Sequence, residues 1–429
     1  MTHGMQTSTF HVITITTDAK LILLKKNSLS PIPPTSLRYT ILLGVIAGLP
    51  ALSIDLSAPT LSILPSVLET TVFAAGLTLS LFVLGFSVGQ FVGGRASDRF
   101  GRRPVLLWAL SIYILAGVCC SFATSGGALA TFRLIQGAGA GACSVQAYAM
   151  VQDLFTGEVA RRKQSYVSIV LTIMPMLAPA LGAALIVLEG WRSVHLSLAI
   201  GGALLLTIVA FHLSETRTPP TQPQTAGLGF AASRQMLHDD DFRRISLVNA
   251  LSYAAIFAYI AGAPVVVSQL GYSSTVYAAM FASTAAALSA GAFMNAGLVQ
   301  RFNSRGLVWP ALLIQAGANV ALVGAALALP TLGPWLLLPP LLIGCFVRGI
   351  ISPNLVYLAI SSHREQAGLA AALVGLAQLV TASASSALLA RLLEPYGAIS
   401  VALTMAALSV TAIVLWLTTR LGRVVVARG

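Results

Sequence analysis

Long uncharged stretches recur along the chain at nearly regular intervals. Each is close to the roughly 20 residues that a helix needs to cross the hydrocarbon core of a bilayer. The signal is continuous hydrophobicity, whereas a membrane strand alternates apolar and polar positions over about ten residues. The pattern therefore predicts twelve transmembrane helices, at about 39–62, 73–94, 104–124, 128–150, 165–187, 193–213, 246–268, 276–298, 307–328, 334–358, 367–389 and 398–419.

Composition supports the same class of protein. Of the 429 residues, 56% are hydrophobic and 9% are charged, whereas a soluble domain carries about a quarter charged residues. A water-soluble fold could not bury that much apolar surface. The sequence thus predicts an all-α integral membrane protein in which the bilayer takes the place of water as solvent.

One long polar interval divides the predicted helices into two sets of six. It contains the run ETRTPPTQPQTAG, whose Pro, Thr and Gln indicate a flexible linker. The loops GGRASDRFGRR and GLVQRFNSRG stand at equivalent places in the two sets and form a faint repeat, which is typical of secondary transporters. The predicted organisation is a disordered cytoplasmic extension (1–38), a six-helix bundle (39–213), a cytoplasmic linker (214–244), a second six-helix bundle (245–420) and a cytoplasmic tail (421–429).

The formal net charge is +12, and the positions of the basic residues along the chain explain this excess. All but four of the 25 Lys and Arg residues lie at the termini or in the even-numbered loops. This positive-inside bias places both termini and those loops in the cytoplasm. The basic charge therefore sets membrane topology, and we expect no nucleic-acid partner.

The residues that other function classes need are missing from the sequence. The four cysteines all fall in predicted spans, without the spacing of a disulfide framework or a zinc site. The chain has no HExxH motif and no phosphate-binding loop. These absences argue against an enzyme, a metal or other cofactor, and direct coupling to ATP.

The loop after the second predicted helix carries the most specific motif. The run LSLFVLGFSVGQFVGGRASDRFGRRPVLL resembles the signature between helices two and three of the major facilitator superfamily. The matching residues are Gly94, Asp98, Arg99, Gly101, Arg102 and Arg103. The resemblance implies a cytoplasmic latch between two six-helix halves that stabilises the outward-facing state.

Physical reasoning about this loop leaves two interpretations. Glycines allow close approach of a neighbouring helix, and Asp98 can accept hydrogen bonds at a helix N-terminus, where the helix dipole favours an anion. The arginines can bridge to Asp98 or to lipid phosphate. Alternatively, the arginines only enforce topology.

Two further motifs resemble the drug:proton antiporters of the superfamily. The run ATFRLIQGAGAG resembles their fourth-helix motif through Arg133, Gln136, Gly137 and Gly139. The run APALGA resembles their fifth-helix motif through Pro179 and Gly182, with Ala in place of the usual first and last Gly. The segments SIDLSAP, GWRSVH, FAYIAGAP, ISPN and AGLAAALVG resemble the Bcr/CflA subgroup, named for bicyclomycin and chloramphenicol resistance.

Asp55 is the only acidic residue well inside a predicted span. A carboxylate there costs a few kcal/mol, and removal from water favours its neutral form, so it is a natural proton carrier. The subgroup places a functional acid in this segment, although its common TDMYLP pattern reads SIDLSAP here. The alternative is a permanently paired structural acid.

Two basic residues lie inside predicted spans. The resemblance implies that Arg133 takes part in proton relay and in closing the cavity. Arg348 stands where the family more often has a small or apolar residue, which indicates acidic substrates or a pairing with Asp55. For both arginines, the alternative is a side chain that snorkels to the membrane interface.

Polar and aromatic residues on other helices are candidates for the substrate cavity, because aromatic faces suit lipophilic or cationic ligands. Ordinary helix packing is the alternative for each. The cavity candidates are Gln146, Tyr148, Tyr253, Phe257, Tyr259, Arg348, Asn354 and Gln378.

The sequence therefore predicts a proton-coupled secondary transporter that exports small lipophilic compounds, such as drugs, from a bacterial inner membrane and functions as a monomer. Its partners are a small-molecule substrate, protons and the lipid bilayer. The alternatives are a dedicated transporter of one metabolite, such as a nucleoside, a siderophore or an amino-acid derivative, and, less favoured, a membrane-embedded enzyme or a sensor.

Overall fold

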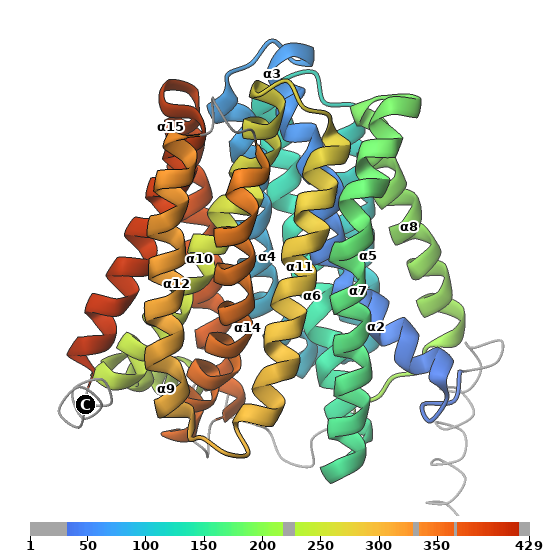
Figure 1. Cartoon of the computed structure of the whole chain (residues 1–429). Helices are drawn as coiled ribbons and strands as arrows, with labels where there is room; N and C mark the ends of the chain where they lie inside the picture. The colour runs from blue at the N-terminus through green and yellow to red at the C-terminus, as the bar shows by residue number, and fades with distance from the viewer. Residues whose placement is uncertain (1–31, 218–227, 329–333, 364–366, 420–429) are drawn as a thin grey trace, which may run out of the picture.

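The structure is a computed structural model, and it describes residues 32–217, 228–328, 334–363 and 367–419. Every regular element in these ranges is a helix, which confirms the predicted all-α class. The long helices run side by side along one common direction (Figure 1). Predictions for the N-terminal extension, the middle of the linker and the C-terminal tail fall outside the described residues, apart from 32–38.

The elements follow one another in two groups. The first group is α2 (Leu37–Ser57), η1 (Ala58–Ser62), α3 (Leu64–Val67), α4 (Val72–Phe100), α5 (Arg102–Ser121), α6 (Gly126–Leu154), α7 (Gly157–Glu189) and α8 (Trp191–His212). The second group is α9 (Leu228–His238), α10 (Asp240–Gln269), α11 (Ser274–Leu298), α12 (Ser304–Leu327), η2 (Pro334–Leu337), α14 (Leu338–Ser361) and α15 (Ala367–Thr418).

Nine helices among the described residues are long and apolar enough to cross a membrane. One of them, α15, contains the last two predicted spans. These are separated by a kink at Gly397, where the backbone leaves the helical region (φ 52°, ψ −137°), two residues after Pro395. Helices α6 and α7 are not among the nine. The number of twelve spans therefore stays a prediction.

Several helices extend beyond the apolar windows. We call the end of the bundle where α4 and α6 finish the basic end, and the end that carries α3 the far end (Figure 1). At the basic end, α4 continues to Phe100, α6 continues to Leu154, and α10 begins at Asp240. The helix α9 also lies inside the predicted linker. Hydropathy marks only the hydrocarbon core, whereas helical hydrogen bonding continues past it.

Packing follows the two groups. In the first, α4 and α5 pack against α6, and α2 packs against α6 and α7; in the second, α10 and α12 each pack against α14 and α15, and α11 packs against α14. The groups meet through α4 with α15, α7 with α11, and η1 with α10. We call the groups the N-terminal half (α2 to α8) and the C-terminal half (α10 to α15).

Glycines make the same kind of close contact in both halves. A Cβ atom at Gly137 of α6 would collide with the carbonyl of Phe82 on α4, and one at Gly349 of α14 would collide with the carbonyl of Leu288 on α11. Small residues let membrane helices approach closely, and van der Waals packing then holds them together. Glycine contacts of the same kind therefore pack equivalent helix pairs in the two halves.

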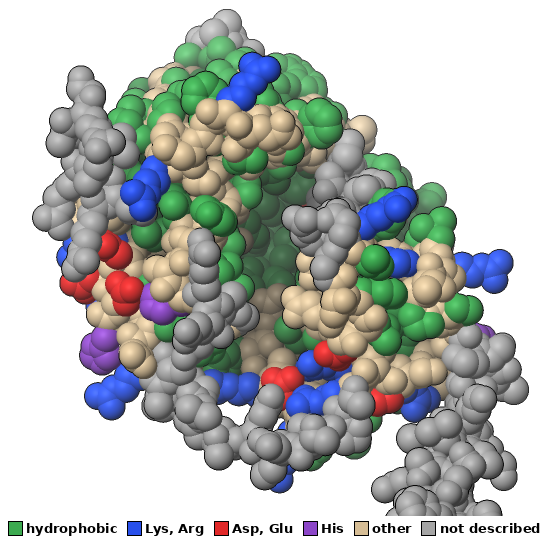
Figure 2. Space-filling model, turned by 90° about the horizontal axis from the view of Figure 1, so that it is seen from below, with side chains coloured by type: hydrophobic (Ala, Val, Ile, Leu, Met, Phe, Trp, Pro, Cys, Tyr) green, Lys and Arg blue, Asp and Glu red, His purple; other side chains and the backbone are tan. Residues whose placement is uncertain are grey.

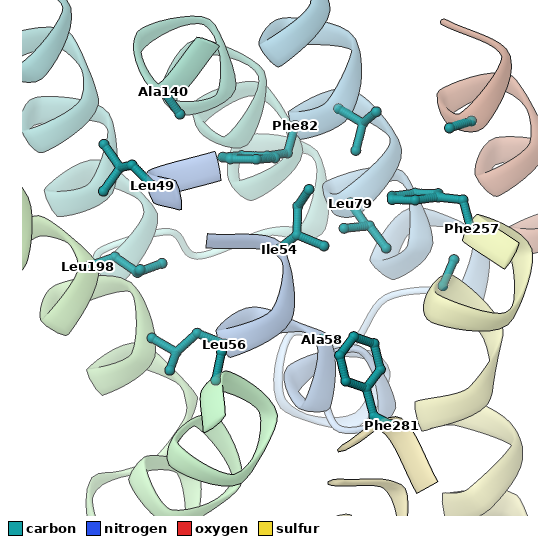
Figure 3. Packing of buried hydrophobic residues seen from close by; sticks show 14 of the residues in the cluster. Leu49, Ile54, Leu56, Ala58, Leu79, Phe82, Ala140, Leu198, Phe257 and Phe281 are labelled. Carbon is teal, nitrogen blue, oxygen red and sulfur yellow. The ribbon is translucent and has the colours of Figure 1, made fainter. Parts of the chain in front are cut away.

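The halves are joined near the far end. The Ser80 hydroxyl on α4 donates to Ser386 Oγ on α15 (2.9 Å), and the Ser383 hydroxyl donates to the carbonyl of Ser80 (2.7 Å). The end of α2 and η1 lies between the halves, where Ile54 and Ala58 pack near Leu79 and the rings of Phe257 and Phe281 (Figure 3). Seen from the basic end, the middle of the molecule is hollowed, and hydrophobic side chains line the hollow (Figure 2).

Candidate functional site

Asp55 lies near the end of α2 with 4% of its surface exposed. Of the acidic side chains whose burial the structure describes, it alone is buried. Its carboxylate forms no hydrogen bond or ion pair with the described residues. It lies within electrostatic range of Tyr253 and Tyr277, which belong to α10 and α11 in the other half. Nothing in the described part of the chain therefore neutralises this group.

Arg133 lies on α6, and 1% of its surface is exposed. Its guanidinium donates to Gln136 Oε1 (2.8 Å), to the carbonyl of Ser53 (3.2 Å) and to Ser57 Oγ (2.9 Å). Its Cζ atom also lies 4.0 Å from the centre of the Phe82 ring. The side chain is therefore directed into the bundle, and it does not snorkel to the membrane interface.

The contacts of Arg133 brace the segment that carries Asp55. Ser53 and Ser57 stand two residues before and two residues after Asp55 on α2. The Ser53 hydroxyl also shares a hydrogen bond of 2.7 Å with the Tyr113 hydroxyl on α5. Two helices, α5 and α6, thus fix this turn of α2. Sequence reasoning missed Ser53, Ser57 and Tyr113, although serines four residues apart share one face of a helix.

Arg348 is buried on α14, with 3% of its surface exposed. Its Nη1 donates to Asn249 Oδ1 (2.9 Å), approaches Ser252 Oγ (3.5 Å), and its Cζ lies 5.6 Å from the Tyr253 ring centre. It does not snorkel, and it makes no ion pair with Asp55 or with any other described acid. The neutral residues Asn249 and Ser252 were missed because an amide or hydroxyl gives a weak signal in sequence.

Some cavity candidates gather beside Arg348. Tyr253 and Phe257 are neighbours on α10, with ring centroids 6.0 Å apart. Gln378 Oε1 on α15 accepts a hydrogen bond of 3.0 Å from Asn249 Nδ2. These side chains and Arg348 form a polar and aromatic cluster on the C-terminal half.

Other cavity candidates serve packing. Gln146 Nε2 donates to the carbonyl of Gly93 (3.1 Å) and so joins α6 to α4. Asn354 Nδ2 donates to Asn295 Oδ1 (2.6 Å) and joins α14 to α11. Tyr259 lines a small apolar cavity formed entirely by elements of the C-terminal half. Tyr148 is half-buried against the hydrophobic core.

A cluster of ion pairs at the basic end contains the loop motif. Arg102 donates from Nη1 to Asp98 Oδ1 (3.0 Å) and from Nε to Asp153 Oδ2 (2.9 Å). Arg217, which follows α8, donates to Asp98 Oδ1 (3.0 Å) and to the carbonyl of Ser97 (3.0 Å). The cluster therefore connects the ends of α4, α5, α6 and α8, all within the N-terminal half.

Glu215 completes this cluster. Its carboxylate accepts hydrogen bonds from the backbone N–H groups of Arg102 (2.9 Å) and Arg103 (3.0 Å), at the N-terminus of α5, where the helix dipole favours an anion. Gly101 makes room for it, because a Cβ there would lie 2.6 Å from Glu215 Oε2 and the backbone has φ +95°. Sequence reasoning gave the capping role to Asp98, whereas the structure gives it to Glu215.

The remaining motif residues differ in their environment. Arg99 is exposed and stacks on Phe100, with 5.3 Å from Cζ to the ring centre. Arg103 donates to the carbonyl of Ala210 on α8 (2.7 Å). Gly94 has only an ordinary contact with Val145. The cluster forms no hydrogen bond or ion pair with the C-terminal half among the described residues, so a latch between the halves stays a prediction for a different conformation.

The motifs on α6 and α7 act through close packing. Gly139 faces the backbone of Ala109 and Tyr113 on α5, and Gly182 faces the carbonyl of Leu56 on α2. Pro179 is buried on α7. The contact at Gly182 places α7 directly against the residue after Asp55.

His195 on α8 is a buried ionisable residue that sequence reasoning did not single out. It is 2% exposed, and both ring nitrogens lack a hydrogen-bond partner in the described part of the chain. Its ring meets Trp191 edge-on, with centroids 5.9 Å apart. Residues four apart share a helix face, so the run GWRSVH predicts this pair.

The chain resembles known proteins in sequence and in structure. A family model described as Major Facilitator Superfamily matches residues 43–386. The chain is 28% identical over 370 residues to YdgK of Bacillus subtilis (strain 168), an uncharacterized MFS-type transporter, and the match covers 84% of this chain and 90% of that protein. It is 30% identical over 230 residues to the multidrug resistance protein MdtL of Klebsiella pneumoniae (strain 342), covering 53% of this chain and 58% of that protein.

Solved structures share the arrangement of helices. A bacterial homologue of the human lysosomal transporter Spinster, in an inward-facing and occupied conformation, has a TM-score of 0.72 at 18% identity, covering 90% of this chain and 96% of that one. The D-xylose–proton symporter has a TM-score of 0.68 at 16% identity, covering 90% and 99%. At these identities the likeness is one of fold alone.

Proposed function

Because the chain belongs to the major facilitator superfamily, we propose that it exports small lipophilic compounds in exchange for protons by alternating access. Family membership and the transporter relatives make it a multi-pass membrane transporter of small molecules and not an enzyme. The proposal adds the proton coupling, the direction of transport and the class of compound. Membership of the Bcr/CflA subgroup stays a prediction.

The single observation that carries the proton coupling is Asp55, a buried acid without a partner among the described residues. Intramembrane acids are rare, and they usually pair with another group or mark an ion or substrate pathway. Because this carboxylate has no cation beside it, its charge is tolerated only while water reaches it. Protonation removes that cost, so the proton and the access of water to Asp55 are coupled.

The turn that holds Asp55 gives this coupling a mechanical route. Arg133 holds Ser53 and Ser57 on either side of it, and Gly182 of α7 packs against Leu56. A movement of α2 relative to α6 or α7 therefore changes the surroundings of Asp55. In this mechanism Arg133 is a positioning residue that acts through the backbone of α2.

Charge and shape together indicate the direction of transport. Cytoplasmic loops of membrane proteins carry excess Lys and Arg, so the basic end faces the cytoplasm. The hollow opens at this end, while serine hydrogen bonds join the halves near the far end (Figure 2). The conformation is therefore one that takes up a substrate from the cytoplasm.

The lining of the hollow and the relatives of the chain indicate the class of compound. Hydrophobic side chains dominate the hollow, and the Tyr253–Phe257 pair offers aromatic faces, which suit lipophilic molecules and cations. MdtL is named as a multidrug resistance protein. Both features favour drug efflux, and hence a role in antibiotic resistance, over the other transporter roles considered from the sequence.

The test uses purified protein in liposomes with an imposed pH gradient and an uncharged lipophilic dye as the transported compound. We expect Asp55→Asn to bind the dye within about threefold of wild type, because Asn keeps the shape of a neutral acid. Gradient-driven accumulation should fall at least about tenfold. Dye binding should release protons in the wild type and none in Asp55→Asn, because the two ligands compete through one conformational equilibrium.

Glu189→Gln is the matched control, because this acid is exposed at the end of α7. It should transport at the wild-type rate. Proton-driven accumulation by Asp55→Asn at the wild-type rate would refute the proposal. Asp153 on α6 is bonded to Arg102, and so it is less suited than Asp55 to carry protons.

A further inference from the structure

The proposed proton mechanism gives no role to Arg348 or to the residues around it. This guanidinium is buried near the middle of α14. A cation at that depth costs a few kcal/mol or more unless it is paired. The cost indicates that the residue meets an anionic group at some stage of the cycle.

Neutral groups from three other helices hold Arg348 in place. Asn249 and Ser252 of α10 accept from its Nη1. Behind them, Gln378 of α15 accepts from Asn249 (3.0 Å), and Gln315 of α12 exchanges hydrogen bonds with Ser252 (2.7 and 3.2 Å). The site is therefore built around the guanidinium, yet nothing in this frame carries a negative charge.

Donors of Arg348 remain open. A guanidinium has five N–H groups in a planar fork that fits a carboxylate, sulfonate or phosphate. Nη1 serves Asn249 and Ser252, while Nε and Nη2 donate to no residue of the described chain. The fork is thus held in position with part of its donor set available.

The opposite half presents the opposite charge. Asp55 has no partner among the described residues, and Tyr253 is in electrostatic range of both Asp55 and Arg348. The two charged groups form no ion pair with each other. An anion and a cation, one from each half and both within electrostatic range of Tyr253, match a ligand that carries both charges.

We propose that the transported compounds are zwitterions with an aromatic body, whose acidic group binds Arg348 and whose amine binds near Asp55 against Tyr253 and Phe257. The Asp55 end rests on the proposed function, because a bound amine requires the ionised carboxylate and so displaces the proton. The Arg348 end is independent of proton coupling. A ligand that bridges the halves also joins them, as alternating access requires.

The test measures binding of three probes that share one body: the zwitterion biphenylalanine, its methyl ester, which is only a cation, and its N-acetyl derivative, which is only an anion. In the wild type, the zwitterion should bind at least about tenfold more tightly than either derivative. Arg348→Gln should weaken the zwitterion and the anion about tenfold and leave the ester unchanged. Asp55→Asn should weaken the zwitterion and the ester and leave the anion unchanged.

Arg391→Gln is the control, because this arginine is exposed on α15 and stacks on Phe73; all three affinities should stay at wild-type values. Equal affinity of the three probes for the wild type, no binding of the zwitterion at millimolar concentration, or an equal loss of ester and zwitterion in Arg348→Gln would overturn the proposal. The comparison of probes on the wild type stands even if Arg348→Gln does not fold. If a pH gradient drives dye transport but the zwitterion is not preferred, this inference alone is refuted. If the zwitterion is preferred but a pH gradient does not drive dye transport, the proton coupling alone is refuted.

Discussion

The three buried charges differ in how the protein satisfies them. Arg133 has three acceptors, all in its own half. Arg348 is held by an amide and a hydroxyl, with donors left open, and Asp55 has no partner in the described chain. A fully bonded charge stabilises one arrangement, whereas an unsatisfied one is available to a ligand or a proton. These differences support the proposed roles: Arg133 positions the structure, and Asp55 and Arg348 take part in transport.

At the same scale, Arg102 and Arg99 separate the two interpretations of the loop motif. Arg102 bonds two carboxylates, whereas Arg99 is exposed and makes no ion pair with a described residue. We expect Arg102→Ala to insert normally and to transport about tenfold more slowly, because hydrogen bonds to charged groups contribute about 1.5–3 kcal/mol each. Transport rates in vesicles, divided by the amount of inserted protein, measure the effect.

Arg99→Ala is the control for this prediction, because it removes the same positive charge from the same loop. It should keep at least about half of the wild-type rate. Equal rates in the two variants would reduce the motif to a topology signal.

Among the elements, the contact of α4 with α15 is one that joins the halves near the far end. Gly76 permits it, because a Cβ there would lie 2.5 Å from the Cβ of Ala390. The serine hydrogen bonds lie one helical turn further along α4. Small residues and hydroxyls form a contact that can open without exposing a large apolar surface.

Gly76→Val should therefore favour the state that is open at the far end. The added side chain cannot fit between the helices in the closed contact, so the halves must separate there. Spin labels at Val67→Cys and Glu394→Cys, on a background without the four native cysteines, would report a longer distance, and transport should fall at least about tenfold. Both label positions are exposed, one on each half.

Gly324→Val on α12 is the control, because nothing lies within 4 Å of a Cβ at that position. It should leave the distance distribution as in the wild type. An unchanged distribution in Gly76→Val would contradict the role given to this contact.

For the whole molecule, the orientation in the membrane decides what the hollow faces. Acidic and basic side chains gather around the basic end, and the hollow lies in the middle of that face (Figure 2). The excess of Lys and Arg over Asp and Glu, 25 against 13, falls mainly in the loops on that side. Charge and shape thus point to loading from the cytoplasm.

Single cysteines test this orientation. With the native cysteines removed, Ser273→Cys at the far end should react with an impermeant maleimide in intact cells. Gln300→Cys at the basic end should react only after the membrane is permeabilised, with a contrast of about tenfold. Both positions are exposed in the structure. The opposite pattern would reverse the proposed direction of transport.

The sequence by itself determined the class of fold, predicted the positions of the membrane helices and singled out Asp55. These properties depend on local composition, because a span is recognised by its length and hydrophobicity, and a lone acid within it is visible without a structure. The loop motif was also readable, since its glycines and charges stand close together in the chain.

Only the tertiary structure decided which side chains meet. Glu215 accepts a hydrogen bond from the backbone of Arg102 across more than a hundred residues, and Arg133 bonds α2. Gln146 and Asn354 bond neighbouring helices within their own halves. The physical reason is that lipid is as apolar as the protein interior. Hydrophobicity therefore marks a membrane helix along its length and does not fix its rotation. That rotation, set by glycine contacts and buried polar groups, determines which residues line the site.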